Sequence, residues 1–251
     1  MSATFEKYSY SFDENDGSTA ATIVQLVGSS RRILELGFGA GVISKALKSK
    51  GREVSGIEID EECVIAARDY MSHAVQGDLS DSSWVNNFRG LEFDAVIVAD
   101  VLEHVSNPGK LLTEIAGLLA EGGKIVCSIP NVGHIGVVAK LLCADFTYGE
   151  TGILDATHLR FFTWRNIEKL FRDSGLVVRL RHQVKCGGWH EEFIREWQML
   201  PAQLSELLAD HPSGTVYQYV FSAVKTTERA AESEWLEADD LELKEWLERD
   251  R

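Results

Sequence analysis

The chain has 251 residues, of which 45% are hydrophobic and 25% are charged. The length predicts one large domain, or one domain with an appendage, and the composition excludes a disordered chain, a collagen and a coiled-coil rod. No apolar run approaches the ~18–20 residues that a membrane helix needs. The polar and acidic N-terminus lacks the pattern of a signal peptide. We therefore expect a cytoplasmic location and no membrane partner.

The chain is strongly acidic, with a net charge of −14 from 39 acidic residues and 25 lysines and arginines. A surface of this sign repels phosphate backbones, so we expect no nucleic-acid partner. The four cysteines lie far apart and show no metal-ligand spacing with histidines, which predicts reduced thiols and no metal site. Residues 226–251 carry ten acidic and four basic residues and are expected to form an acidic helical tail.

The first half of the chain alternates between two kinds of segment. A helix is expected at 18–27, with Ser18 as its N-cap. Strands are then expected at 32–36, 53–59, 73–75, 93–100 and 124–129, and segments with helical spacing at 42–50, 61–71 and 108–119. Strands separated by helices of this length indicate βαβ units and a parallel sheet. Right-handed crossovers make such a sheet doubly wound, so the expected fold class is α/β with a Rossmann-like sheet.

The regular alternation breaks after residue 130. Residues 130–162 and 186–214 look irregular, and a helix at 164–174 and strands at 176–184 and 215–225 complete the domain. We therefore expect an N-terminal lid or helix segment at 1–30 and a main domain at 31–225. The two irregular stretches would be inserts that form a substrate pocket, because loops at strand ends carry specificity.

A glycine-rich loop follows the first expected strand and opens the next helix. It reads Glu35-Leu36-Gly37-Phe38-Gly39-Ala40-Gly41. Glycines at such a turn allow the backbone to approach a ligand closely. The dinucleotide fingerprint GxGxxG would need a glycine at position 42, where the chain has Val42. The carboxylate of Glu35 suits an amine or a cation better than a pyrophosphate.

Three further acidic residues follow expected strands. Glu58 lies where a carboxylate can accept the hydroxyls of a ribose. Asp78 is placed to bind an adenine amino group, with Leu79 packing against the ring, and Asp100 ends the fourth strand. Ligands of open α/β sheets bind at the carboxyl ends of the strands, so all of these side chains are candidate binding residues.

These segments, taken as an ordered set, resemble the class I S-adenosylmethionine-dependent methyltransferases of the small-molecule group. The matching stretches are Ile33-LELGFGAG, Val54-SGIEID, Gln76-GDLSD, Phe93-DAVIVADVLEHV and Leu119-AEGGKIVCSIPN. The resemblance implies a seven-stranded, mostly parallel sheet with an antiparallel last strand. It also implies S-adenosylmethionine as cofactor and S-adenosylhomocysteine as product.

The same resemblance assigns roles to the candidate residues. It places Glu35, Gly37, Gly39 and Gly41 at the methionine part of the cofactor. It places Glu58 at the ribose, Asp78 and Leu79 at the adenine, and Asp100 beside the methyl group that is transferred.

Methyl transfer to a hydroxyl requires a base, and histidine suits this role near neutral pH. His158 is the first candidate, because its segment resembles one found in methyltransferases of glycans and small metabolites. His134 and His104, which follow the fifth and fourth strands, are the other candidates.

The expected activity is methyl transfer to oxygen or nitrogen of a small-molecule acceptor such as a sugar, a glycan or a natural-product intermediate. Two alternatives stay open at this point: an NAD(P)-dependent oxidoreductase on a Rossmann sheet, and a non-catalytic S-adenosylmethionine-binding protein. The sequence does not identify the acceptor, the base among the three histidines or the role of the tail. It also leaves the oligomeric state undecided, a homo-oligomer included.

Overall fold

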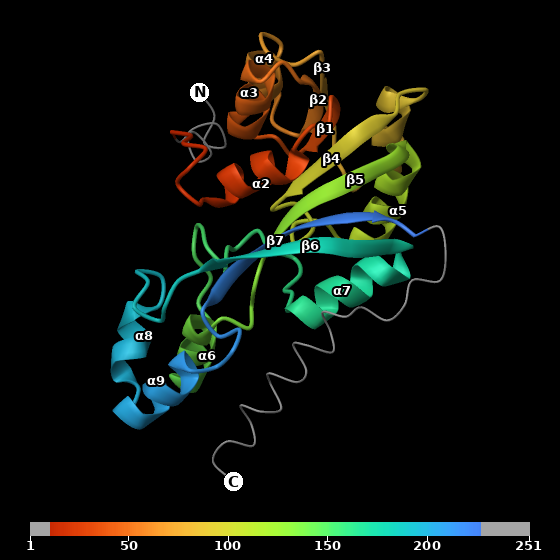
Figure 1. The fold of residues 1–251 in the computed structure, drawn as a ribbon. Coiled ribbons are helices and arrows are strands. Elements are labelled where there is room, and N and C mark those ends of the chain that lie inside the picture. The colour runs from red at the N-terminus through yellow and green to blue at the C-terminus, as the bar shows by residue number, and fades with distance from the viewer. Residues whose placement is uncertain (1–10, 227–251) are drawn as a thin grey trace.

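A computed structural model describes residues 11–226; residues 1–10 and 227–251, which hold almost all of the expected acidic tail, lie outside the described part. The domain is built on a seven-stranded sheet with the order β3-β2-β1-β4-β5-β7-β6 (Figure 1). Its strands are β1 (Arg32–Leu36), β2 (Glu53–Glu58), β3 (His73–Gln76), β4 (Phe93–Ala99), β5 (Leu119–Pro130), β6 (Leu176–Lys185) and β7 (Val216–Lys225). The first five pair in parallel, and β7 pairs antiparallel with both β5 and β6. The predicted fold class, including the antiparallel last strand, is confirmed.

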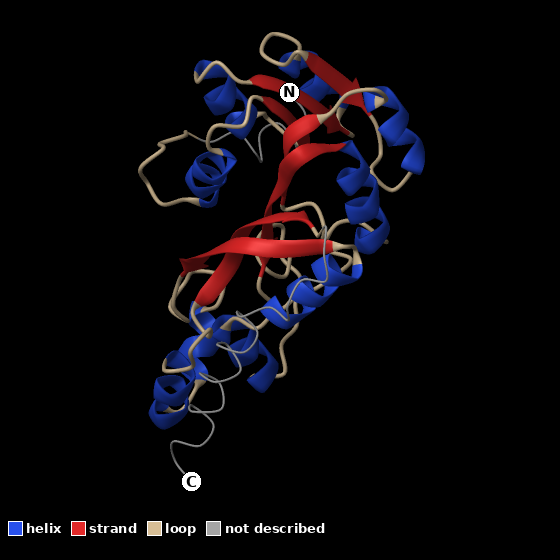
Figure 2. Cartoon of the chain, turned by 45° about the vertical axis from the view of Figure 1, so that its right-hand side comes forward, coloured by secondary structure: helices blue, strands red, loops and turns tan. Residues whose placement is uncertain are grey.

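Helices cover both faces of this sheet, as the turned view in Figure 2 shows. They are α2 (Thr19–Val27), α3 (Val42–Ser49), α4 (Glu61–Ala67), α5 (Pro108–Leu118) and α7 (Trp164–Asp173), with a 3-10 turn at Ser82–Phe88. Alternate residues of a strand point to opposite faces. Accordingly Ile33 belongs to a core cluster with residues of α2, α3 and α4, while its neighbour Leu34 belongs to a second cluster with residues of α5 and α7. The sheet is thus doubly wound around two hydrophobic layers.

Local capping signals decide where several helices begin. Ser18 Oγ accepts a hydrogen bond from the Ala21 amide at 3.2 Å, as its position before α2 predicts. Asn107 Oδ1 caps α5 through the Lys110 amide at 3.1 Å, and Pro108 occupies the first turn. These two predicted helix starts are confirmed.

The fifth strand begins earlier than the sequence suggests. It was expected at residue 124, but β5 begins at Leu119, directly after α5. Its register against β4 shifts between Phe93 and Ala95, opposite the segment of β5 that contains Gly122 and Gly123. A Cβ on Gly123 would lie 2.8 Å from the Phe93 carbonyl oxygen, so the close approach of the two backbones requires glycine there.

The two inserts are more regular than expected. They contain α6 (Ile135–Leu142), α8 (Ile194–Met199) and α9 (Ala202–Ala209), which lie together beyond one end of the sheet (Figure 1). A separate small core of Val137, Ile153, Leu154 and Phe193 holds them together. The helical pattern in each insert is only six to eight residues long, and it is stable because it packs against the other insert.

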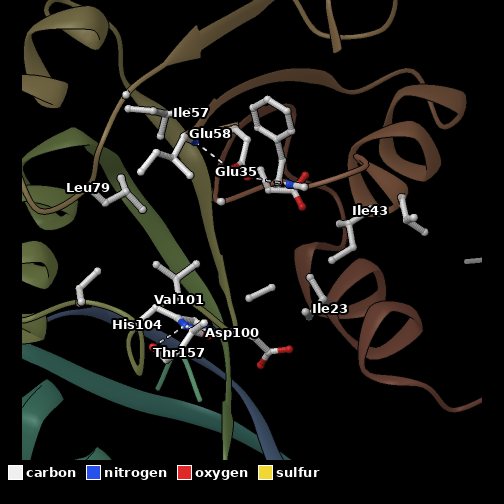
Figure 3. A pocket seen from close by; sticks show the side chains of 18 of the residues that line it. Ile23, Glu35, Ile43, Ile57, Glu58, Leu79, Asp100, Val101, His104 and Thr157 are labelled. Atoms are coloured by element: carbon white, nitrogen blue, oxygen red, sulfur yellow. Dashed lines mark hydrogen bonds between the residues drawn. The ribbon is translucent and has the colours of Figure 1, made fainter. Parts of the chain in front are cut away.

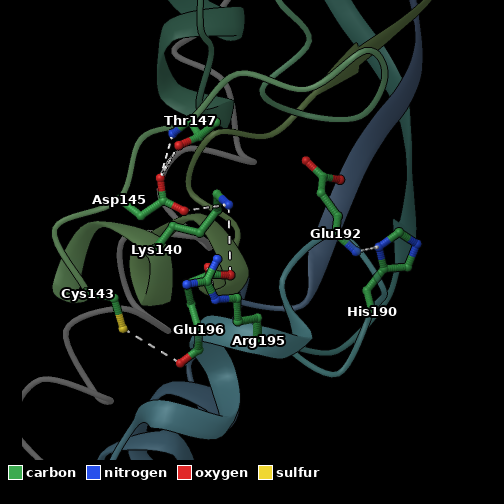
Figure 4. A network of polar contacts seen from close by, with 8 residues as sticks. All are labelled: Lys140, Cys143, Asp145, Thr147, His190, Glu192, Arg195 and Glu196. Carbon is green, nitrogen blue, oxygen red and sulfur yellow. Dashed lines mark hydrogen bonds and ion pairs between the residues drawn. The ribbon is translucent and has the colours of Figure 1, made fainter.

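An ion-pair network joins the two inserts (Figure 4). Lys140 of α6 lies 3.0 Å from Asp145 and 3.8 Å from Glu196 of α8. The side chains of Lys140 and Glu196 are only 11% and 7% exposed. Because a buried carboxylate without a cation is costly, Lys140 should stabilise the docking of α8 on α6.

We expect Lys140→Met to lower the free energy of unfolding by on the order of 2 kcal/mol, because it leaves the buried Glu196 with only the exposed Arg195, at 3.9 Å, as a cationic neighbour. Chemical denaturation measures this loss. The double variant Lys140→Met/Glu196→Gln should regain most of it. Lys169→Met, which breaks an exposed pair with Asp173, is the matched control and should change stability little. An equal loss in both single variants would contradict a stabilising role of the insert network.

Within residues 11–226, no helix combines the length and the apolar character that crossing a membrane requires.

Candidate active site

A cavity of about 580 Å³ opens at the carboxyl ends of β1, β2 and β4 (Figure 3). This volume lies in the range of small-molecule and cofactor sites. Glu35 and Glu58 lie at one end of the view, and Asp100, His104 and Thr157 lie at the other. The lining also includes α2, through Thr19, Ala20 and Ile23. Helix α2, which belongs to the expected lid or helix segment at 1–30, thus forms one wall of the cavity.

The glycine loop between β1 and α3 forms the upper wall of the cavity. Gly37, Gly39 and Gly41 have φ angles of 64°, 50° and 71°, a region that side chains other than glycine rarely adopt. A Cβ on Gly41 would lie 2.0 Å from the Tyr70 hydroxyl oxygen. The spacing of the three glycines is thus explained by backbone conformation, and Gly37 and Gly39 also line the cavity.

Glu35 lies on β1 beside this loop and is buried, with 3% of its surface exposed. Its carboxylate accepts a hydrogen bond from the Ser44 hydroxyl of α3. Burial raises the pKa of Glu35 to about 7, and the nearby charge of Glu58 adds to the shift. A carboxyl group of this kind gains most from a cationic partner, such as an ammonium group of a bound molecule.

Glu58 is the last residue of β2 and is hydrogen-bonded to the glycine loop, which the sequence predicts to bind the same cofactor. One carboxylate oxygen accepts from the Gly39 amide at 2.8 Å, and the other accepts from the Ile59 amide at 2.7 Å. Glu58 therefore holds the glycine loop while it faces the cavity.

Asp78 and Leu79 follow β3 at the rim of the cavity. One carboxylate oxygen of Asp78 accepts from the Ser80 amide at 2.7 Å, which orients the side chain. The structure thus brings all of the predicted cofactor-binding residues except Gly41 into the lining of one cavity.

Asp100 has an unusual backbone conformation for a residue that is not glycine, with a φ of 52°. Its carboxylate accepts hydrogen bonds from Ser128 Oγ at 2.8 Å and from the amide of Gln218. The side chain is open to the cavity. The surrounding protein nevertheless removes water from its carboxyl group, and this desolvation raises the pKa of Asp100 above the usual value. Strained residues of this kind cluster at functional sites because the structure around them holds them in place.

Gln218 and Thr19 are cavity residues that the sequence did not single out. The Thr19 hydroxyl donates to Gln218, and Gln218 in turn donates to Asp100, so α2, β7 and β4 meet in one network. In the sequence, Gln218 differs from its neighbours only as a polar residue in the mostly apolar run of β7. The structure shows that it is buried there.

Two of the three candidate histidines meet at the lower end of the cavity. His104 lines it, and Nδ1 of His104 lies 3.2 Å from the carbonyl oxygen of Thr157. His158 packs edge-to-face against His104 with ring centroids 4.8 Å apart, and its Nδ1 lies 2.9 Å from the carbonyl oxygen of Ile153. His158 lies behind His104 rather than in the cavity lining.

His134 has a different position. It is fully buried at the start of α6, where Nδ1 accepts from the Gly136 amide at 3.0 Å and Nε2 lies 2.9 Å from the Cys186 carbonyl oxygen. It is not among the residues that line the cavity. A base role for His134 does not fit this placement, because both ring nitrogens serve to cap the helix and dock the second insert.

The first insert contributes Thr157 to the cavity lining, whereas residues 186–214 contribute none of the lining residues. The expectation that both inserts form the pocket therefore fits only the first of them in this structure. The second insert covers the first one instead, through α8 and Phe193.

Glu103 is a further residue of interest that the sequence analysis missed. It is 1% exposed, and neither carboxylate oxygen has a hydrogen-bond partner in the described part of the chain. Burial and the nearby charge of Asp100 raise the pKa of Glu103 well above its usual value. The only sequence signal was its place beside His104 after the fourth strand.

Comparison with known proteins places this chain in a family. A model of the methyltransferase domain matches residues 12–180. The chain therefore belongs to the class I S-adenosylmethionine-dependent methyltransferases, as the ordered motifs predicted. This match decides against the alternative of an NAD(P)-dependent oxidoreductase. It begins before the expected domain boundary at residue 31 and so includes α2.

Curated relatives and solved structures agree with this family. The chain is 28% identical over 158 residues to a ubiquinone biosynthesis O-methyltransferase of Psychrobacter arcticus, covering 59% of each protein. It is 25% identical to the enzyme of the same name from Aeromonas salmonicida, covering 66% of this chain and 76% of that one. The match to the first of these relatives thus spans only 59% of its length. Magnesium protoporphyrin IX methyltransferase from Synechocystis shares the fold, with a TM-score of 0.57 at 16% identity over 83% of this chain and 82% of that one.

Proposed function

We propose that this protein transfers the methyl group of S-adenosylmethionine to a hydroxyl oxygen of a small-molecule acceptor. The observation that carries this proposal is the single cavity in which Glu35, Glu58 and Asp78 line one side while Asp100 and His104 line the other. The relatives named as O-methyltransferases support oxygen as the acceptor atom. The net charge of −14 supports an acceptor other than a nucleic acid, because an acidic surface repels phosphate backbones.

The cofactor would lie along the upper part of the cavity. Glu35 would face the ammonium group of its methionine part, with the backbone of the glycine loop beside the carboxylate. Glu58 would accept the ribose hydroxyls, and Asp78 and Leu79 would hold the adenine. These positions leave the sulfonium methyl group near Asp100, where the cavity continues toward His104 and Thr157.

Methyl transfer from a sulfonium is an in-line displacement. A lone pair of the acceptor oxygen forms the new C–O bond while the C–S bond breaks and its electron pair stays on sulfur. The enzyme must hold the oxygen ~3–3.5 Å from the methyl carbon, and the hydroxyl must lose its proton. We place the acceptor hydroxyl at His104, so that the groups at this end of the cavity promote the loss of its proton.

Calorimetric titration with S-adenosylmethionine, S-adenosylhomocysteine and NAD tests the cofactor assignment. We expect micromolar binding of the two sulfur compounds and none of NAD; the opposite result would overturn the proposal. A transfer assay with methyl-labelled S-adenosylmethionine and a panel of phenols, sugars and amines then tests the acceptor. Labelling of amines alone would contradict oxygen as the acceptor atom, and binding without any transfer would favour a non-catalytic protein.

The affinity for S-adenosylhomocysteine should depend on pH through Glu35. Because burial raises the pKa of Glu35 to about 7, the protein without cofactor holds this carboxyl protonated below that pH. A bound ammonium group favours the carboxylate, so binding displaces the proton. We expect affinity to fall as pH falls below about 7, by at most ~10-fold per pH unit, and to level off above it.

Calorimetry between pH 5.5 and 8 measures this dependence. Two neighbouring groups also face Glu35, Glu58 on β2 and Tyr70 after α4, so the control is the variant Glu35→Gln, which keeps both. This variant should bind more weakly at pH 8 and lose most of the slope. A slope that persists unchanged in Glu35→Gln would remove Glu35 from the ammonium site.

A further inference from the structure

We propose that Glu103, His104 and His158 form a binding site for a divalent transition-metal ion at the acceptor end of the cavity. One possible ligand atom from each of the three residues lies within 4.8 Å of the other two. The three side chains come from the turn after β4 and from the first insert, so the fold, and not the local sequence, brings them together. This is why the search for metal-ligand spacing in the sequence predicted no metal site.

The two histidines are oriented as metal ligands usually are. Nδ1 of His104 lies 3.2 Å from the Thr157 carbonyl oxygen, and Nδ1 of His158 lies 2.9 Å from the Ile153 carbonyl oxygen. A carbonyl oxygen accepts only from a protonated nitrogen, so these contacts place the proton of each neutral ring on Nδ1. Nε2 of each ring then keeps its lone pair, and such a backbone contact is the usual support of a metal-bound imidazole.

Glu103 supplies the negative charge of the site. It is 1% exposed, and both carboxylate oxygens lack hydrogen-bond partners among residues 11–226. The acidic residues Glu58 and Asp100, which line the cavity, are by contrast satisfied: Glu58 accepts from backbone amides, and Asp100 accepts from Ser128. A buried carboxylate with no partner is costly, and a cation bound directly to its oxygens removes that cost.

The ligand set defines the kind of cation. Two imidazoles and one carboxylate suit Zn²⁺, Mn²⁺, Fe²⁺ or Co²⁺ better than Ca²⁺ or Mg²⁺, which prefer oxygen ligands. Ligand atoms of a tetrahedral zinc site lie ~3.4 Å apart, so small side-chain rotations would complete the site. Three protein ligands leave at least one coordination position open, and an ion bound to His104, the ligand that lines the cavity, would be reached from there.

The role of this ion rests on the proposed function. An acceptor oxygen that occupies the open position would become more acidic, because a bound divalent cation stabilises the oxyanion. Its proton would pass to water, and the oxygen would attack the methyl carbon as the C–S bond breaks. His104 would then act on the acceptor through the ion that it binds.

The binding itself can be tested without catalysis. Protein freed of metal with a chelator and then desalted is titrated with Co²⁺, in a calorimeter and by visible absorption. We expect one strong site per chain and absorption bands of low-symmetry Co²⁺. The variants Glu103→Gln and His158→Asn should each weaken this site at least 10-fold. The matched controls are Glu168→Gln, a buried glutamate on α7, and His182→Asn, an exposed histidine on β6; both should bind Co²⁺ like the wild type.

Each outcome decides between clear alternatives. No strong site, or a site unchanged in Glu103→Gln and His158→Asn, would overturn the inference, the latter because Co²⁺ then binds elsewhere on this acidic chain. Titration of the same samples with S-adenosylhomocysteine separates the two proposals. Cofactor binding without the Co²⁺ site removes the ion and leaves the proposed function intact. Co²⁺ binding without cofactor binding supports the ion site and contradicts the proposed function.

Discussion

Replacing His104 by alanine should lower the turnover number by ~10²–10⁴-fold, the range that activation of an acceptor hydroxyl commonly contributes. His104 is the histidine that lines the cavity, and it lies at the end away from Glu35 and Glu58. The affinity for S-adenosylhomocysteine should therefore stay within about a factor of three of wild type. Steady-state kinetics with a saturating acceptor, together with calorimetry on the same preparation, measure both quantities.

The matched control is His182→Ala, which removes an exposed histidine on β6 outside the cavity and should leave turnover unchanged. Thermal unfolding of both variants checks that they fold. Full turnover in a folded His104→Ala protein would show that the acceptor is not activated at this corner of the cavity. Equal loss of turnover and of cofactor affinity would instead indicate that His104 organises the whole cavity.

The second large effect is expected at Glu58. Alanine there removes hydrogen bonds of a charged acceptor to the ribose, each worth ~1.5–3 kcal/mol. At about 1.4 kcal/mol per factor of ten, we expect the affinity for S-adenosylhomocysteine to fall at least ~100-fold. The variant also removes the acceptor of the Gly39 amide, so the glycine loop loses a contact in the same change.

Two further variants separate these contributions. Glu58→Asp keeps the charge but draws it back from the loop, and we expect an intermediate affinity. Glu53→Ala, at the exposed start of the same strand, should bind like the wild type. Wild-type affinity in folded Glu58→Ala would exclude Glu58 from the ribose site. A variant that fails to fold would instead show that the main role of Glu58 is to hold the glycine loop in its conformation.

The architecture of the sheet was predictable because its signals are local. The alternation of strand and helix patterns, and caps such as Ser18 and Asn107, depend only on residues that are close together in the chain. The glycine loop was also readable, since a positive φ at Gly37 and Gly41 restricts the residue type wherever the loop occurs. The order of the acidic residues along the chain indicated the candidate cofactor site for the same reason: each one lies at or just after the carboxyl end of a parallel strand, and those strand ends share one edge of the sheet.

The inserts and the acceptor end of the cavity were not predictable in this way. Helices α6 and α8 are too short to be stable alone, and only their contact with each other makes them regular. The sequence favoured His158 as the base over His134 and His104, but the spatial neighbours of a histidine cannot be read from the residues beside it in the chain. Packing then put His134 into a helix cap, His158 behind His104, and His104 at the cavity wall.

Short-range patterns in this chain thus specify the doubly wound sheet, the glycine loop and the acidic residues at the strand ends, because backbone conformation and side-chain periodicity depend on residues a few positions apart. Tertiary packing alone decides the acceptor end. There the partners of Asp100 come from β7 and β5 and the partner of His104 comes from the first insert; these segments are distant in the chain and become neighbours only when the chain folds.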